Sequence, residues 1–263
     1  MQYTEKYNST VKLLKELNSN QMEKNKLIYK KCDCVSGGNF NFIDYIKQSD
    51  FCKNIFENYE FSTINDFRDN IVEKISDDFV KYVINKGFPC MDREKKDIKN
   101  SIIGLQGELF NILYLEKYSI YTDPITGIAK RFNCVLPYDI VMQQKDYGVD
   151  LVCLNQNDEI CFIQVKFYST WSMNQGHKIE LKEHCEGLML ELWRNFDTPF
   201  NYCNPDHLFF TFLGDKKKDI TVYFQGSPYK NCITFIDKND YYRALAGNTT
   251  VFKDFYKFLL SIN

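Results

Sequence analysis

Residues 148–166 read GVDLVCLNQNDEICFIQVK, and they predict the central element of the fold. It holds two short apolar runs, rich in Val, Ile, Leu, Phe and Cys, on either side of the polar segment 155–158. Short apolar runs that are bounded by a polar turn are typical of two neighbouring β-strands. The stretch therefore predicts a β-hairpin with an apolar body.

The register of this hairpin is expected to bring polar side chains together. If Leu154 pairs with Ile160, then Asp150 lies opposite Gln164. Side chains alternate between the two faces of a strand, so Gln164 and Lys166 share the face of Asp150. A carboxylate, an amide and an ammonium are therefore expected to converge at one end of the hairpin.

The sequence on either side predicts helices and further strands. Before the hairpin, apolar residues recur at helical spacing over 101–118, and this helix contains Gly107-Glu108. The other elements expected after residue 118 are strands near 133–142, 148–154, 159–168, 207–213, 220–225 and 232–236, and helices at 179–195 and 251–260. This order predicts an α/β fold, with a mixed central sheet flanked by helices.

The first part of the chain predicts helices only, over 1–31, 43–59 and 64–85, with a break at 32–41. The charged run 92–97 follows the third helical tract. We place a domain boundary there. The chain is then divided into a helical N-terminal region, residues 1–97, and a second domain, residues 98–263.

Composition narrows the class of protein. The 263 residues are 44% hydrophobic and 26% charged, as in folded proteins rather than disordered ones. The net charge of −2 provides no overall field that attracts nucleic acid, so contact with a polyanion would depend on local patches. The apolar stretches are too short for a membrane span, and we expect no membrane partner.

Ten cysteines occur without a secretory signal pattern at the start and without a C-x-x-C pair. Free thiols are expected in a reducing compartment, such as the cytoplasm, the nucleus or a virus-infected cell. With three histidines, a zinc site is not expected. His184-Cys185 does not predict a thiol protease, because adjacent residues of a helix point about 100° apart.

Glu108 in a Gly-Glu helix, Asp150 on one strand and Gln164-x-Lys166 on the next resemble the PD-(D/E)XK nuclease superfamily. The Gln in place of the usual acid is similar to its Mrr-like branch, which includes domains attached to restriction helicases. The resemblance covers roughly residues 98–215. It implies a restriction-endonuclease-like core and a Mg²⁺-dependent DNA endonuclease, with double-stranded DNA as substrate and a helicase as a possible partner.

The chemistry of these residues agrees with that implication. Hydrolysis of a phosphodiester needs an activated water and a counterion, and a bound Mg²⁺ (or Mn²⁺ as a substitute) supplies both. Asp150 is expected to bind the ion directly, Gln164 through its amide oxygen, and Glu108 through water. The family pattern adds the carbonyl of Val165. Lys166 is expected to orient the attacking water or to stabilise the transition state.

The charge of the site predicts how many ions it holds. Glu108 and Asp150 together carry −2, which balances one Mg²⁺, whereas a Glu at position 164 would make the pocket more anionic. We therefore expect a single tightly held ion.

Polar side chains after the hairpin are candidates for contacts with phosphates or bases, because they follow Lys166 or stand where the next helix begins. They are Tyr168, Ser169, Gln175, His177, Lys178 and Lys182. A solvated helix start explains the last four equally well. The chain has no glycine-rich phosphate loop, so we expect no helicase motor in it.

Other interpretations stay open. Asp150 is also compatible with a turn, Gln164 and Lys166 with the solvent face of an edge strand, and Glu108 with an ordinary helix surface. The alternative function is a non-catalytic nucleic-acid-binding or assembly protein that keeps the nuclease fold. An RNA substrate remains open too. A homodimer is plausible, because cutting both strands of a duplex needs two sites or a reorientation.

Overall fold

The computed structural model describes residues 5–34, 40–60, 63–88, 91–118, 121–122, 129–144, 148–167, 175–196, 207–213, 232–246, 248 and 250–263. Side chains are described in all of these ranges except at 34, 121–122, 129–130 and 175–181. The expected strand at 220–225 lies outside the described residues.

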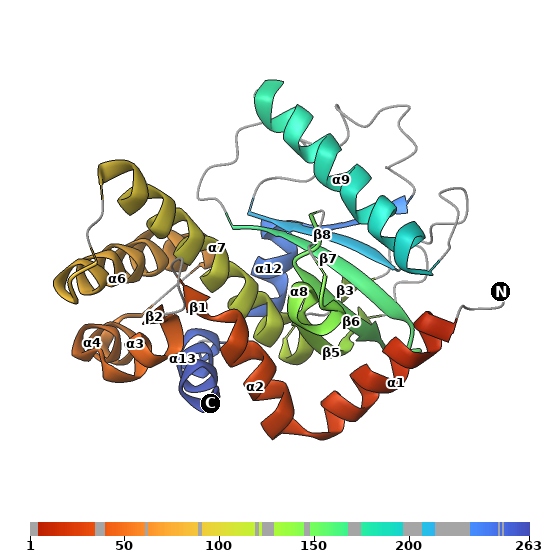
Figure 1. Cartoon of the computed structure of the whole chain (residues 1–263), viewed down its shortest axis with the longest axis horizontal. Helices are drawn as coiled ribbons and strands as arrows, with labels where there is room; N and C mark the ends of the chain where they lie inside the picture. The colour runs from red at the N-terminus through yellow and green to blue at the C-terminus, as the bar shows by residue number, and fades with distance from the viewer. Residues whose placement is uncertain are drawn as a thin grey trace.

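The centre of the structure is a five-stranded sheet in the order β5-β6-β7-β8-β9 (Figure 1). The first three strands are antiparallel to one another, and β7, β8 and β9 are parallel. The prediction of a mixed sheet flanked by helices is confirmed. The strands are β5 (Phe132–Pro137), β6 (Leu151–Asn155), β7 (Ile160–Lys166), β8 (Leu208–Phe212) and β9 (Thr234–Ile236).

The hairpin of β6 and β7 has the predicted register. Leu154 pairs with Ile160, and the ladder continues to Leu151 opposite Ile163. Asp150 lies one residue before β6, and its backbone N–H donates to the carbonyl of Ile163 at 3.0 Å. The hairpin forms at the predicted residues because every residue of β6 is buried and the polar residues lie in the turn.

The N-terminal part is helical, as predicted. It contains α1 (Glu5–Ser19), α2 (Gln21–Lys31), α3 (Phe42–Gln48), α4 (Asp50–Asn58), α5 (Ile64–Phe67), the π-helical turn η1 (Arg68–Val72) and α6 (Glu73–Asn85). The short strands β1 (Asp33–Cys34) and β2 (Phe40–Asn41) pair within the expected break. The tract 43–59 is two helices rather than one, because Ser49 is extended and its Oγ accepts from the N–H of Cys52, which caps α4.

A single helix, α7 (Asp92–Lys117), begins earlier than the expected 101–118 helix. The charged run 92–97 forms its first turns, where the Glu94 carboxylate accepts from the backbone N–H of Met91 at 2.7 Å. The boundary placed at residue 97 therefore falls inside a helix. The division into two domains stays a prediction.

A second difference concerns the expected strand at 133–142. The strand ends at Pro137, and α8 (Tyr138–Met142) follows directly. Proline cannot donate to a ladder and suits the residue before a helix. The short ladder of β3 (Tyr121–Thr122) with β4 (Ala129–Lys130) and the helix α12 (Lys238–Leu245) were not predicted, whereas α13 (Val251–Ser261) was.

Helices cover both faces of the sheet (Figure 1). Side chains alternate along β7, so Phe162 and Phe167 point to opposite faces. Phe162 packs on Phe196 of α9 (Gln175–Phe196) with ring centroids 5.6 Å apart. Phe167, directly after β7, lies against Gly107 of α7. The long helices α9 and α7 therefore pack on different faces of the strand that carries the predicted site.

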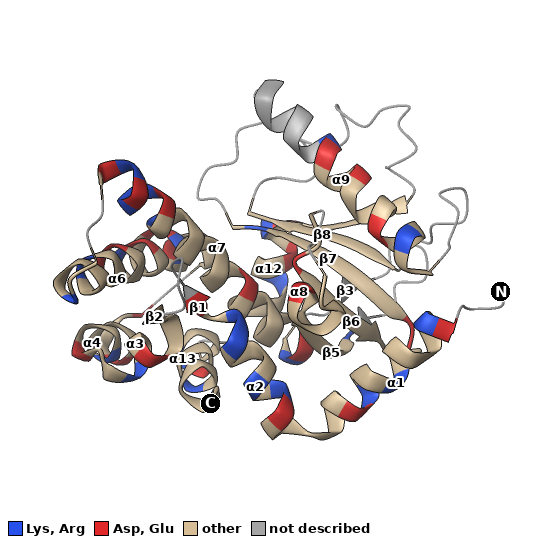
Figure 2. Cartoon of the chain, in the orientation of Figure 1, with Lys and Arg blue, Asp and Glu red and all other residues tan. Residues whose placement is uncertain are grey.

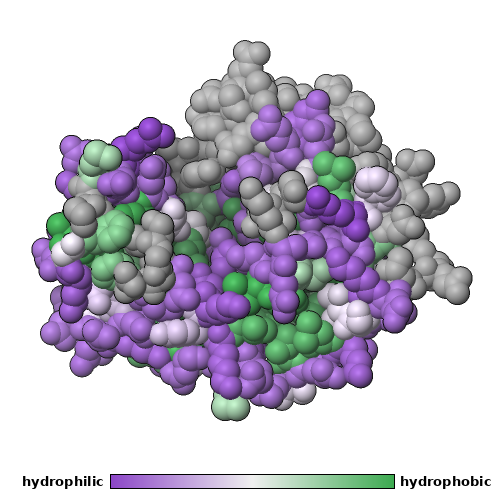
Figure 3. All heavy atoms as spheres, in the orientation of Figure 1, coloured by the Kyte–Doolittle hydropathy of each residue, from purple (hydrophilic) through white to green (hydrophobic). Residues whose placement is uncertain are grey.

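The surface on the side shown in Figure 3 is mostly hydrophilic, with apolar patches between the charged residues. Among the described helices, none is long and apolar enough to cross a membrane. The described cysteines are all free thiols.

Candidate functional site

Lys166 is the only charged residue in the five strands of the central sheet. Figure 2 shows the same contrast, with charges gathered on helices and the strands almost free of them. Lys166 ends β7 and is half-buried. The residues around this charge at the end of an apolar strand indicate what it contributes.

The helix α7 comes unusually close to the end of β7. A Cβ atom added at Gly107 would lie 2.5 Å from the Cβ of Phe167, which is closer than real Cβ atoms approach. Glycine at 107 therefore lets the helix touch the strand, and the next residue, Glu108, is carried to the end of the hairpin. The Gly-Glu pair has a packing role as well as a chemical one.

A cavity of about 330 Å³ lies at this contact. The four predicted catalytic residues and Val165 all lie on its wall, so the structure brings together the residues that the sequence predicts. Its lining consists of Arg68, Asn100, Ile103, Gly104, Glu108, Asp150, Gln164, Val165, Lys166 and Phe167.

The carboxylate of Asp150 is held by the opposite strand. Its Oδ2 accepts from the backbone N–H of Val165 at 2.6 Å and from the side-chain Nε2 of Gln164. The carbonyl of Asp150 accepts from the N–H of Tyr138 at 3.0 Å, which fixes the backbone as well. Asp150 is therefore positioned by two elements, β7 and α8, rather than left as a turn residue.

The other end of the Gln164 amide is unsatisfied. Gln164 is 2% exposed, and within the described part of the chain its Oε1 finds no hydrogen-bond donor. A buried acceptor without a donor costs about 1–3 kcal/mol. A half-turn of the amide exchanges Oε1 and Nε2, so the same side chain can present oxygen toward Asp150 when a cation is present.

Glu108 is largely buried, with 15% of its side chain exposed. Burial raises the pKa of the Glu108 carboxyl to about 8, Lys31 opposes this, and Asp150 adds to it. The sequence interpretation of an ordinary surface acid is therefore wrong for Glu108.

Lys31, the last residue of α2, lies at the site but was not predicted there. Its Nζ lies 3.2 Å from Oε2 of Glu108 and 3.2 Å from Oδ1 of Asp139, and the side chain is 17% exposed. Burial alone would lower the pKa of Lys31, but the carboxylates of Glu108 and Asp139 outweigh it and raise the pKa. In the sequence Lys31 is one of many lysines in this region, and only the fold shows its place.

Arg68 was missed as well. It is 4% exposed, its Nε donates to the carbonyl of Phe167 at 2.6 Å, and its Nη1 lies 2.8 Å from the carboxylate of Glu73. These contacts tie the end of β7 to the N-terminal helices. Arg68 therefore supports the wall of the cavity.

The predicted nucleic-acid contacts are only partly described. Tyr168 and Ser169 lie outside the described residues. Gln175, His177 and Lys178 stand in the first turns of α9, where the backbone alone is described. Lys182 is exposed and lies 3.7 Å from Glu186. Their role remains a prediction.

The donors around the cavity fit a hard cation. Asp150 offers a carboxylate, Gln164 an amide whose buried Oε1 finds no donor among the described residues, and Glu108 a second carboxylate from α7. Mg²⁺ is bound in this way, by one or two carboxylates with water in the remaining positions. Clusters of three or more His, Cys, Asp or Glu side chains, which would suit softer or more tightly caged metals, are not found among the residues described.

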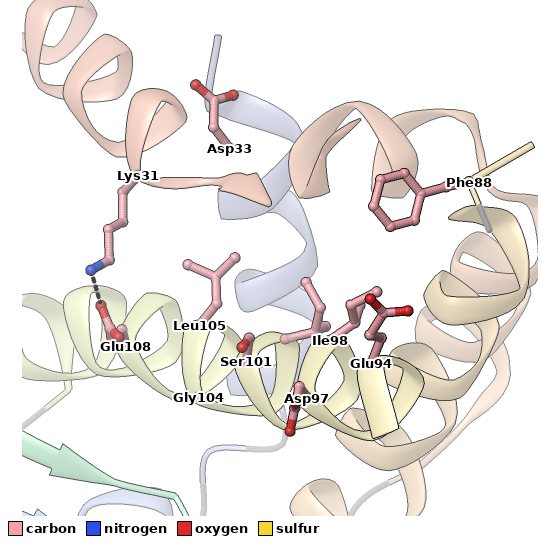
Figure 4. A pocket seen from close by; sticks show the side chains of 11 residues that line it. Lys31, Asp33, Phe88, Glu94, Asp97, Ile98, Ser101, Gly104, Leu105 and Glu108 are labelled. Atoms are coloured by element: carbon pink, nitrogen blue, oxygen red, sulfur yellow. Dashed lines mark ion pairs between the residues drawn. The ribbon is translucent and has the colours of Figure 1, made fainter. Parts of the chain in front are cut away.

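A second cavity, of about 670 Å³, lies beside the first along α7 (Figure 4). Both cavities are lined by Gly104 and Glu108, so Glu108 stands between them. Comparison with family models, with curated proteins and with solved structures finds no match for this chain. The site is therefore interpreted from its own chemistry.

Proposed function

We propose that the chain is a Mg²⁺-dependent endonuclease of the PD-(D/E)XK, Mrr-like type that hydrolyses phosphodiester bonds in DNA. The observation that carries the proposal is the cavity that brings Asp150, Gln164, Glu108 and Lys166 together. The buried Oε1 of Gln164 finds no donor within the described part of the chain, and a rotation of the amide would turn this oxygen toward Asp150. A hairpin end with a purely structural role does not need two carboxylates, an amide and an ammonium around one cavity.

In this proposal Asp150 and Gln164 hold the ion, and the carbonyl of Val165 is a further ligand. A bound Mg²⁺ would polarise the scissile phosphate and lower the pKa of a water. Lys166 reaches the same cavity as an ammonium and compensates the negative charge that develops on the phosphate. Glu108, across the cavity from the strand, accepts a hydrogen bond from a water and so orients it.

The substrate we propose is double-stranded DNA, bound with the help of the first turns of α9 and the segment before it. A homodimer would allow cleavage of both strands, and a helicase partner would add translocation along the DNA. The described free thiols support a reducing compartment for the protein.

Nicking of a supercoiled plasmid tests the proposal. Wild type should nick the plasmid in Mg²⁺ or Mn²⁺ and not in EDTA, and Asp150→Ala and Lys166→Ala should each abolish nicking. Asp158→Asn is the matched control, because Asp158 lies at the turn end of the same hairpin and pairs with Lys15 at the surface. Nicking that survives both alanine substitutions would overturn the assignment.

The same assay addresses the alternative. If no form cleaves and DNA binding persists, the chain is a non-catalytic nucleic-acid-binding protein with this fold. A parallel RNA substrate shows whether cleavage is restricted to DNA.

A further inference from the structure

Lys31 joins three elements that are distant in sequence. It ends α2, and its ammonium lies between Glu108 of α7 and Asp139 of α8, at 3.2 Å from an oxygen of each. Figure 4 shows Lys31 reaching down to Glu108 at the edge of the larger cavity. The site therefore already contains a cation, and this cation belongs to the protein.

The two partners of Lys31 differ in what else they can reach. Glu108 lines the cavity that holds Asp150 and Gln164, whereas Asp139 lines neither of the two cavities described above. The Asp139 side chain is 34% exposed, and that of Glu108 is 15% exposed. Asp139 therefore contacts Lys31 from outside both cavities, and Glu108 is shared between Lys31 and the cavity.

Electrostatic forces would move Lys31 away from Glu108 when a divalent cation binds. A divalent cation beside Asp150 repels the ammonium of Lys31 and attracts the carboxylate of Glu108. A buried ammonium that lost its partner would be strongly disfavoured. Because Asp139 is already in contact, Lys31 can leave Glu108 without becoming unpaired.

We propose that Lys31 is an internal cation that is exchanged between Glu108 and Asp139, and that it releases Glu108 to a divalent cation when one binds. The proposal rests on the proposed function insofar as that function places a cation at Asp150 and Gln164. It makes Lys31 a positioning residue of the site, and it gives the N-terminal helices a direct part in the chemistry.

The exchange predicts opposite effects for two substitutions. Lys31→Met removes the competitor for Glu108, so binding of Mg²⁺ should become roughly tenfold tighter once Glu108 is ionised in the variant, which needs a higher pH because Lys31 lowers the pKa of this carboxyl. Asp139→Asn removes the alternative partner, so Lys31 stays on Glu108 and binding should become roughly tenfold weaker. Lys31→Arg keeps the charge and should bind Mg²⁺ much as wild type does.

A matched control separates the exchange from general loss of charge. Asp33 lines the larger cavity together with Lys31, and its Oδ1 accepts from Nδ2 of Asn41. Asp33→Asn removes the same charge from the same region without touching the exchange. It should weaken Mg²⁺ binding clearly less than Asp139→Asn does.

The experiment is isothermal titration of the full chain and its variants with Mg²⁺, and separately with Ca²⁺, at several pH values from 8.0 to 9.5, and affinities are compared where they no longer rise with pH. Thermal unfolding of each variant shows that it is folded. Tighter binding by Lys31→Met with weaker binding by Asp139→Asn supports the exchange. If both substitutions shift the affinity in the same direction, or if Asp139→Asn matches Asp33→Asn, the exchange is overturned while the metal site stands.

Two further results of the titration also decide between the proposals. If wild type binds no divalent cation, the proposed metal site and the exchange both fail. If Lys31→Met does not fold, the comparison of Asp139→Asn with Asp33→Asn decides alone, because equal affinities would overturn the exchange and a larger loss for Asp139→Asn would support it.

Discussion

Glu108 is the residue whose behaviour depends most on its surroundings. Its carboxyl has a pKa raised from 4.5 to about 8, chiefly by burial. Between these two values the folded chain holds a proton that the unfolded chain releases. Stability therefore declines as pH rises from about 4.5 to about 8 and then levels off.

The decline of stability with rising pH can be measured. Unfolding by urea from pH 5 to pH 9 should show the decline in wild type, and Glu108→Gln should remove that part of the pH dependence. Mg²⁺ affinity should rise through the same interval, because the proton on Glu108 must leave before the carboxylate faces a cation. A Glu108→Gln profile identical to that of wild type would contradict the raised pKa.

Gln164 sets the charge of the site. Gln164→Glu replaces the amide that donates to Asp150 with a third carboxylate in the cavity, and without metal it should destabilise the fold by about 1–3 kcal/mol. Mg²⁺ should restore the lost stability, since the ion neutralises the added charge. Thermal unfolding with and without Mg²⁺ measures this.

Gln106→Glu is the matched control, because Gln106 is fully buried in α7 away from the cavity. It should destabilise the fold without any recovery in Mg²⁺. If Mg²⁺ rescues neither variant, position 164 does not face a cation.

The number of ions is a separate prediction. With Glu108 and Asp150 as the two carboxylates of the cavity, one Mg²⁺ balances the site. Calorimetry of a catalytically inactive complex with DNA should give one tight site. Two equivalent tight sites would contradict the charge argument.

At the scale of elements, the contact of α7 with β7 is the feature that assembles the site. Gly107→Ala puts a Cβ against Phe167, and the resulting shift should cost about 1–3 kcal/mol in the free energy of unfolding. It should also reduce cleavage, because Glu108 moves with the helix.

Gly104 offers the control one turn earlier in the same helix. Nothing lies within 4 Å of a Cβ at this position, so Gly104→Ala should leave stability unchanged or raise it by up to about 1 kcal/mol. Urea unfolding of the two variants checks both values. Equal effects would show that the close approach of α7 to β7 has no energetic weight.

Part of the site could be predicted from the sequence of these elements. The β6–β7 hairpin and its register follow from local apolar runs and a polar turn, so Asp150, Gln164 and Lys166 could be placed together beforehand. Glu108 was placed by resemblance, and the structure puts it on the same cavity. Lys31 and Arg68 reach the site only through tertiary packing, which no local pattern encodes.

Errors in the elements have local causes. The end of β5 at Pro137 and the break at Ser49 each depend on one residue that overrides a longer apolar pattern. The early start of α7 depends on a capping contact by Glu94 in a run that is too polar to show helical periodicity.

At the scale of the whole molecule, the N-terminal helices and the sheet share one hydrophobic core. Tyr7 of α1 accepts from the backbone N–H of Ile160 in β7 at 3.1 Å. Lys24 of α2 is 3% exposed and pairs with Glu116 of α7, which also accepts from the N–H of Val135. These contacts make the first two helices part of the sheet's packing.

A fragment of residues 92–263 tests this dependence. Without α1 to α6 it exposes apolar surface and leaves Glu116 without Lys24, so it should lack a cooperative urea transition. Circular dichroism of the fragment beside the full chain measures this. A fragment that unfolds cooperatively would instead support the division of the chain near residue 97.

We propose that a divalent cation binds between the end of the hairpin and α7. Anomalous X-ray diffraction from crystals of the protein soaked in Mn²⁺ would locate this ion. We expect one strong peak within coordination distance of the Asp150 carboxylate and Oε1 of Gln164, on the side that faces Glu108. No peak in this cavity, or a peak only elsewhere on the molecule, would contradict it.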